Sequence, residues 1–355
     1  MGILSDIAGR LSSPSEAIRI FAAEDLGAEQ RADSAHLLVE RLAQEQSRAV
    51  QQAIFHALTA IGVEAVAGYV PSLLESEDPY VRNQAVRMVQ GGGTTSVPIV
   101  RELLASSDHD IRKLAVDVLS GLRFEDAADL YAIAIGDPDM NVVITAMESI
   151  RPRQNARLAD LVVQKVLEAN HPMLLLAGLE SLVRLQDRSA YIRFRARFCP
   201  LTAIDSLVLP HAVKLAGQHG GEQEMQELAE LLPRANAVLR SSAFDAIHAL
   251  FSRGLPIPAG VDRHLLAALA HDSTGVTRYQ LLVIAGDFRQ SEAVIESLRA
   301  FLDSPEKLER LGAVEGLVTN LSEEARPYFR ARLEIETDPE VREAIVAATN
   351  SVGGA

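Results

Sequence analysis

The sequence contains no tryptophan and only one cysteine, and aromatic residues form 5% of its 355 residues. A single cysteine excludes an internal disulfide and a cysteine-based zinc cage. Because 48% of the chain is nevertheless hydrophobic, the core is expected to be aliphatic. No uninterrupted apolar run approaches the roughly 18 residues that a membrane-spanning helix requires. Since the N-terminus also has no leader pattern, we expect a cytoplasmic protein.

Basic residues are also scarce, with 34 Lys and Arg against 48 Asp and Glu and a net charge of −14. Phosphate backbones and anionic lipids repel such a chain, so we expect neither nucleic acid nor a membrane as its main partner. The histidines lack the close spacing of a metal site, and Cys199 has no neighbouring histidine to activate it. We therefore expect no metal, no cofactor and no catalytic residues.

A short pattern recurs at intervals of about thirty residues. The sequence Asp-x-x-Val/Ile-Arg-x-x-Ala/Ile occurs at 78–85, 108–115 and 338–345. Its arginine marks a register position that can be followed along the chain. The successive register residues are Arg19, Gln51, Arg82, Arg112, Asn141, Leu174, Leu209, Arg240, Arg278, Arg310 and Arg342. The sixth and seventh of these eleven units match the pattern poorly.

Each unit is predicted to be a helical hairpin, because its apolar residues follow a 3.6-residue period. Asp78, Asp137 and Asp338 precede prolines and are expected to cap second helices, and glycines such as Gly27 and Gly62 are expected to end them. One hairpin cannot bury its apolar face alone, so neighbouring hairpins must stack. We predict an all-α fold, a right-handed α-solenoid of about eleven hairpins over residues 1–350, with a tail at 351–355. A flexible joint is expected near 254–260, where glycines and prolines interrupt the longest unit.

The Asp-Pro-x-Val-Arg-x-x-Ala pattern resembles the signature of HEAT repeats, in particular the short bacterial kind that also occurs in phycobilin lyases. The resemblance covers nearly the whole chain. It implies that the repeated Asp and Arg form a structural ladder tying each hairpin to the next. The ladder residues are Asp78, Arg82, Asp108, Arg112, Arg240, Arg278, Arg310, Asp338 and Arg342. It also implies an alternative function, accessory activity in bilin chromophore attachment, although no residue carries over from that family.

The middle of the chain is basic, with nine Lys and Arg and four Asp and Glu between residues 151 and 197. Its residues predicted to bind a partner are Arg151, Arg153, Arg157, Arg184, Arg188, Tyr191, Arg193, Arg195 and Arg197. A basic patch that carries aromatic side chains suits an acidic protein partner. The alternative is that these bases pair with neighbouring acids. The segment 191–198 alternates as a strand does, but its place among helices favours a helix.

A second candidate surface is the concave face of the solenoid, formed by the second helices five residues after each register position. Its predicted residues are Glu24, His56, Arg87, Asp117, Ala146, Leu179, Lys214, Asp245, Val283, Glu315 and Ala347. This mixture of charges suits a folded protein partner better than DNA, which would require Lys and Arg throughout. An ordinary solvated surface is the alternative.

We interpret the chain as a non-enzymatic scaffold or adaptor. An alkylpurine glycosylase is disfavoured, because such enzymes rely on tryptophan and a basic groove.

Overall fold

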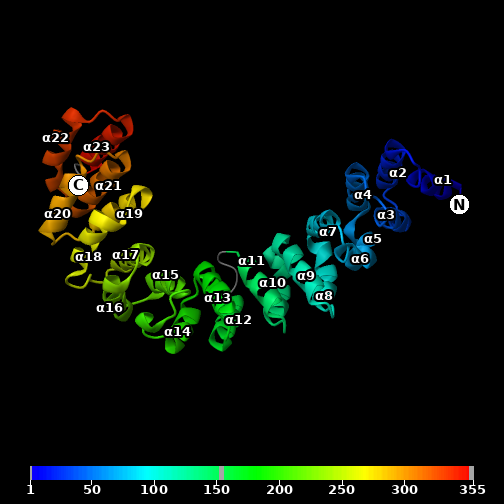
Figure 1. Cartoon of the computed structure of the whole chain (residues 1–355), viewed down its shortest axis with the longest axis horizontal. Coiled ribbons are helices and arrows are strands. Elements are labelled where there is room, and N and C mark those ends of the chain that lie inside the picture. The colour runs from blue at the N-terminus through cyan, green and yellow to red at the C-terminus, as the bar shows by residue number, and fades with distance from the viewer. Residues whose placement is uncertain (1, 152–155, 352–355) are drawn as a thin grey trace. The chain divides into compact units, whose positions relative to one another are not determined.

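The computed structural model describes residues 2–151 and 156–351, and it contains no strand among them (Figure 1). The predicted all-α solenoid is confirmed. Internal contacts divide the chain into two compact units, residues 1–185 and 186–355, which we describe separately. Arg153 and residues 352–355 of the predicted tail lie outside the described residues.

Within its described residues, unit 1 consists of six hairpins. Its first helices are α1 (Gly2–Leu11), α3 (Ala35–Leu42), α5 (Val63–Val66) with α6 (Val70–Leu74), α8 (Val97–Leu104), α10 (Phe124–Ile135) and α12 (Ala156–Glu168). Its second helices are α2 (Glu16–Glu29), α4 (Arg48–Ile61), α7 (Pro79–Gly91), α9 (His109–Gly121), α11 (Met140–Ser149) and α13 (Pro172–Leu185). Successive second helices pack side by side, as α2 does with α4.

The described part of unit 2 has five hairpins. Its first helices are α14 (Arg188–Arg197), α16 (Glu222–Leu231), α18 (Val261–Ala267), α20 (Glu292–Phe301) and α22 (Arg326–Ile335). Its second helices are α15 (Leu209–His219), α17 (Ala237–Phe251), α19 (Gly275–Ala285), α21 (Lys307–Leu321) and α23 (Pro339–Ser351). The strand-like alternation of residues 191–198 therefore lies mostly in a helix, α14.

Short helical turns join these helices. The 3-10 turns are η1 (Ala32–Ser34), η2 (Ala67–Tyr69), η3 (Gly93–Ser96), η4 (Leu201–Ala203), η5 (Leu232–Arg234) and η7 (Ser322–Ala325), and η6 (Ala268–Asp272) is a π turn. Among the described residues, none of the helices could cross a membrane by itself. The pair Arg48–Ile61 and Val63–Leu74 has the necessary length and composition only when taken together, and it is bent by 115°.

Side-chain caps fix where the second helices begin. The Asp78 carboxylate accepts a hydrogen bond from the Tyr80 amide at 2.9 Å, and Asp338 accepts one from the Glu340 amide at 3.0 Å. Pro79 follows its cap at a position where no helix amide is missed. Each cap satisfies an amide that the helix itself leaves free.

The cap of α11 is Asp139, and the prediction of Asp137 was wrong. The Asp139 carboxylate accepts from the Asn141 amide at 2.8 Å, whereas Asp137 is buried before the helix. In regular repeats the register residue lies four positions after the cap and donates its amide to the cap carbonyl, as Arg112 does to Asp108 at 3.1 Å. The cap therefore defines the register even where arginine is absent.

This rule moves the register of the fifth and sixth repeats. The Val143 amide bonds to the Asp139 carbonyl at 3.2 Å, and the Leu175 amide bonds to the His171 carbonyl at 3.1 Å. The register residues are therefore Val143 and Leu175, two residues and one residue later than the sequence pattern predicted. The intervals from the fourth register position to the seventh become 31, 32 and 34 residues.

Small residues allow the second helices to approach each other closely. A Cβ atom on Gly27 would lie 2.8 Å from Cα of Ala57, so Gly27 lies at an α2–α4 contact inside the helix and does not end it as predicted. Gly62 does end α4, with φ +105°. The packed alanines of the pattern are buried in the same way; they are Ala22, Ala85, Ala115, Ala243 and Ala313.

Candidate functional site

The register arginine first closes the turn of its own hairpin. Nη1 of Arg310 donates to the Ser304 and Pro305 carbonyls at 2.9 and 3.0 Å, six and five residues earlier. The same two backbone positions are bound by Arg19, Arg82 and Arg112. Because arginine has several donors in a rigid fork, its other nitrogens remain available for a second task.

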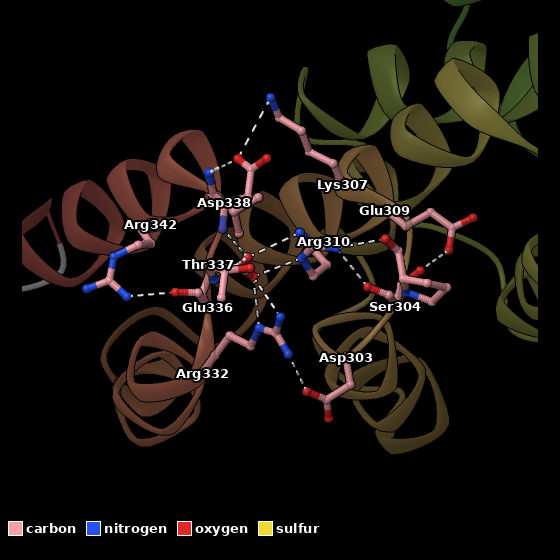
Figure 2. A network of polar contacts seen from close by, with 12 residues as sticks. Asp303, Ser304, Lys307, Glu309, Arg310, Arg332, Glu336, Thr337, Asp338 and Arg342 are labelled. Atoms are coloured by element: carbon pink, nitrogen blue, oxygen red, sulfur yellow. Dashed lines mark hydrogen bonds and ion pairs between the residues drawn. The ribbon is translucent and has the colours of Figure 1, made fainter.

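That second task is a link to the next hairpin. Nε and Nη2 of Arg310 donate to the two oxygens of Glu336 at 2.8 and 3.1 Å, and Arg332 reaches the same carboxylate (Figure 2). Arg112 binds Asp137 in the same bidentate way at 2.8 and 3.0 Å. The acids lie six residues before the register position of the following repeat. The same kind of link joins Arg19 to Glu45, whereas Arg278 pairs with Glu309 of the next second helix.

The aspartates of the sequence pattern cap the second helices, and Asp78 also takes part in the ladder. Asp78 does not pair with Arg82 of its own repeat; it caps α7 and accepts from Arg48 of the preceding repeat. Asp108 caps α9, and Asp338 caps α23. The ion pairs of Arg19, Arg112, Arg278 and Arg310 therefore run between repeats.

Glu336 is a strongly held ladder carboxylate, with a side chain 1% exposed. Burial alone would raise its pKa, but hydrogen bonds from the Asp338 amide, Arg332 and Arg310 outweigh burial and lower the pKa of Glu336 to about 2. Glu45, held by Arg19 and Arg41, behaves alike, with a pKa of about 2. Both acids are engaged by neighbouring arginines inside the protein, so they tie successive repeats together.

In unit 1 the predicted basic residues bind their own structure. Arg151 donates to the Ser120 carbonyl at 2.6 Å, and Arg184 donates to the Met147 carbonyl at 3.0 Å. Arg157 is exposed and pairs with exposed Asp129 at 3.0 Å. An exposed pair of this kind adds little to stability. Because the Arg157 side chain is 67% exposed, it is accessible to a partner.

In unit 2 the basic residues of α14 divide between surface and core. Arg188, Arg193 and Arg197 are exposed. Arg195 is 7% exposed and Tyr191 is 4% exposed, so the structure contradicts their placement on a binding surface. Burial raises the pKa of Tyr191. The helix α14 therefore contributes Tyr191 and Arg195 to the core, and its three exposed arginines are accessible to a partner.

Arg195 is held by two acidic side chains of α16. Its Nε donates to Glu224 at 3.0 Å, and its Nη2 donates to both oxygens of Glu227 at 2.8 Å. Glu227 also accepts from the Leu201 amide at 2.7 Å. The alternative interpretation of the basic segment, pairing with neighbouring acids, therefore applies to Arg195.

The corrected register changes the second predicted surface. Ala146 and Leu179 are buried, and the residues five positions after the corrected registers are Glu148 and Glu180, neither of which is buried. The second-helix face, defined by this position in each repeat, consists of Glu24, His56, Arg87, Asp117, Glu148, Glu180, Lys214, Asp245, Val283, Glu315 and Ala347. With six acids and two Lys or Arg, this face is more acidic than the sequence pattern indicated.

An acid–histidine pair joins two repeats beside the second-helix face of unit 2. Nδ1 of His248 in α17 lies 2.6 Å from the Asp287 carboxylate, which follows α19. The hydrogen bond to Asp287 raises the pKa of His248 above 6.5, and the charge of Asp245 adds to this effect. Because the folded-state pKa is raised, the pair stabilises the fold below pH 6.5, and this contribution is lost as the pH rises through the raised pKa.

A pocket of about 510 Å³ lies in unit 2 between the end of α17 and the turns 256–260 and 287–291. Pro256, Ile257, Pro258 and Phe288 line it, and Asp287 contributes a polar group. This lining could receive a small apolar ligand. The predicted flexible joint at 254–260 falls here and stays a prediction.

Comparison with known proteins identifies repeats of a known type. Residues 6–87 match the family model of HEAT repeats. Over 99% of this chain, the structure is similar to importin beta with a TM-score of 0.60 and 11% identity, and to Kap121p with a TM-score of 0.50 and 11% identity. An engineered protein aligns over 100% of both chains at 16% identity, but its TM-score of 0.40 supports no argument. No curated protein sequence matches the chain.

These similarities establish the fold alone, because the sequence identities are low. The chain spans 60% of the importin beta chain and 50% of the Kap121p chain that it matches. Relationship to the phycobilin lyase kind of repeat stays a prediction. The function must therefore be argued from the surfaces of the molecule.

Proposed function

We propose that the chain is a non-enzymatic scaffold or adaptor that binds another protein through its second-helix face. The observation that carries the proposal is the recurrence of accessible side chains at one position of successive packed helices, such as Lys214, Asp245 and Glu315 in unit 2. Stacked hairpins repeat a surface at a fixed spacing, and extended binding surfaces of this kind suit protein ligands.

The mixed charge of this face supports a folded protein or peptide as the partner. Acids predominate in it, so a partner with basic groups fits it, and nucleic acid does not. The predicted acidic partner fits instead the exposed arginines of α14, namely Arg188, Arg193 and Arg197. A cytoplasmic location fits both possibilities.

A pull-down from native cell lysate separates these two surfaces. In one variant, Lys214→Glu and Asp245→Lys exchange two exposed charges of the second-helix face without changing the net charge. In the control variant, Arg193→Glu and Arg197→Glu reverse exposed charges on α14. We expect mass spectrometry to find a partner that wild type and the α14 variant retain and the face variant loses. Loss of the partner only from the α14 variant would assign binding to the basic segment and refute the proposal.

An accessory role in bilin attachment is the second candidate. The pocket lined by Pro256, Ile257, Pro258 and Phe288 favours it, because an apolar chromophore needs a largely apolar enclosure. Visible absorbance of the protein after co-expression with a bilin pathway distinguishes this candidate from a scaffold, which stays colourless.

A further inference from the structure

Unit 2 exposes large apolar side chains at one recurring position. Leu207, Val238, Val276 and Leu308 are 49%, 74%, 62% and 40% exposed. Each lies two residues before a register position: Leu207 lies just before α15, and the other three lie in the first turns of α17, α19 and α21. We call these four residues the apolar row.

The apolar row follows successive packed helices, because α15 packs on α17, α17 on α19 and α19 on α21. Single exposed apolar residues are normal on protein surfaces, but recurrence at one register position in adjacent repeats is not expected by chance. In unit 1 the same position holds Ala17, Ala49, Tyr80, Asp110, Asn141 and Met173. Of these, Tyr80 stacks under the Arg48 guanidinium at 4.7 Å.

Charges around the apolar row are mainly acidic. Asp205 and Glu306 are exposed two residues before Leu207 and Leu308. Asp245 and Glu315 are exposed seven residues after Val238 and Leu308, two turns further along the same helices. The exposed base at that position is Lys214, seven residues after Leu207. The charge of this surface complements basic groups and opposes acidic ones.

The spacing of the row restricts the shape of an occupant. Packed helices lie about 8–10 Å apart, so we expect successive row residues to repeat at about that interval. A polyproline II segment advances about 3.1 Å per residue and three residues per turn, which brings every third side chain to the same face at about 9 Å. An α-helix returns to one face every three to four residues, about 5.4 Å along its axis, so its side chains match the row interval less well, at about 10.5 Å over two turns.

We infer that the apolar row binds an extended segment of a partner protein that carries an aliphatic side chain at every third position and basic side chains between them. This inference rests on the proposed function and names the class of partner segment. A second copy of the chain is a poor occupant, because it would bring the acids of two rows together. An anionic membrane is repelled for the same reason.

Fluorescence anisotropy with synthetic peptides tests the inference on the full chain. The probe is a labelled peptide of about 12 residues built from Val-Pro-Lys repeats, long enough to span four row positions. Control peptides replace Lys by Glu, or place Val at every seventh position of a helical sequence. The row variant is Val238→Lys with Val276→Lys, and the matched control is Ile192→Lys with Ile335→Lys, two residues 58% and 64% exposed elsewhere in unit 2.

We expect the Val-Pro-Lys peptide to bind wild type and the control variant, with affinity that falls as salt rises. Affinity for the row variant should fall at least about tenfold, since two aliphatic contacts are lost. Equal binding to both variants, or no binding to wild type, overturns the inference, and stronger binding of the heptad peptide overturns the extended occupant. If the peptide does not bind wild type but the Lys214→Glu and Asp245→Lys variant loses its partner in the pull-down, only this inference is refuted. If that variant keeps the partner, the proposed function itself is refuted.

Discussion

Replacing Arg195 by Leu is expected to destabilise unit 2 by about 3–5 kcal/mol, because it leaves two buried carboxylates without their cation. The Glu224 and Glu227 side chains are 12% and 8% exposed, and both bind the Arg195 guanidinium. Neither can recover its hydration without opening the α14–α16 contact. Hydrogen exchange of the α14 and α16 amides measures the loss locally, since an array of repeats need not unfold in one step.

Two further variants separate burial from charge. Arg197→Leu removes an exposed arginine of the same helix and should change stability by less than about 0.5 kcal/mol. Adding Glu224→Gln and Glu227→Gln to Arg195→Leu should restore part of the lost protection, because the uncompensated charges disappear. Equal exchange in the Arg195→Leu and Arg197→Leu proteins would contradict the buried cluster.

Neutralising Glu336 is expected to weaken the last ladder link strongly at neutral pH. The pKa of Glu336 is about 2 in the folded protein, against an ordinary value of 4.5. A lowered folded-state pKa adds stability above pH 4.5, and this stability is lost as the pH falls from 4.5 through 2. Glu336→Gln should therefore cost on the order of 3 kcal/mol at neutral pH and almost nothing near pH 2.

Urea denaturation at several pH values, with hydrogen exchange of α21 and α23, measures this difference. Glu334→Gln supplies the control, because it neutralises an exposed acid of the adjoining helix α22. Its effect should be small at every pH. A Glu336→Gln protein as stable as the Glu334→Gln protein at neutral pH would show that the Arg310–Glu336 link does not hold the two repeats together.

The repeats were predictable because their signals are local. Helical period, cap and, in seven of the eleven hairpins, the register arginine occur together within one hairpin, so the sequence alone predicts eleven stacked hairpins. The error arose where arginine is missing: Asp137 and Asp139 both resemble caps, but the Asn141 amide binds Asp139, whereas Asp137 is bound by Arg112. Counting four residues from the true cap would have identified Val143 as the register residue.

The surfaces were less predictable, because they depend on contacts between helices. Charge density over residues 151–197 could not separate buried Arg195 from exposed Arg197. The spacing of Tyr191, Phe194 and Phe198 at three and four residues did contain a signal, since it puts these rings on one helical face with Arg195 beside them. The apolar row also has a sequence signal, the position two residues before the register.

The proposed function requires that the second helices, and not the first, contact the partner. Site-specific photo-crosslinking in native cells tests it most directly, with the crosslinker at exposed Gln280 of α19 or at exposed Glu296 of the first helix α20. We expect a covalent adduct with a partner protein from position 280 and none from position 296. An adduct from position 296 alone, or equal adducts from both positions, would contradict it.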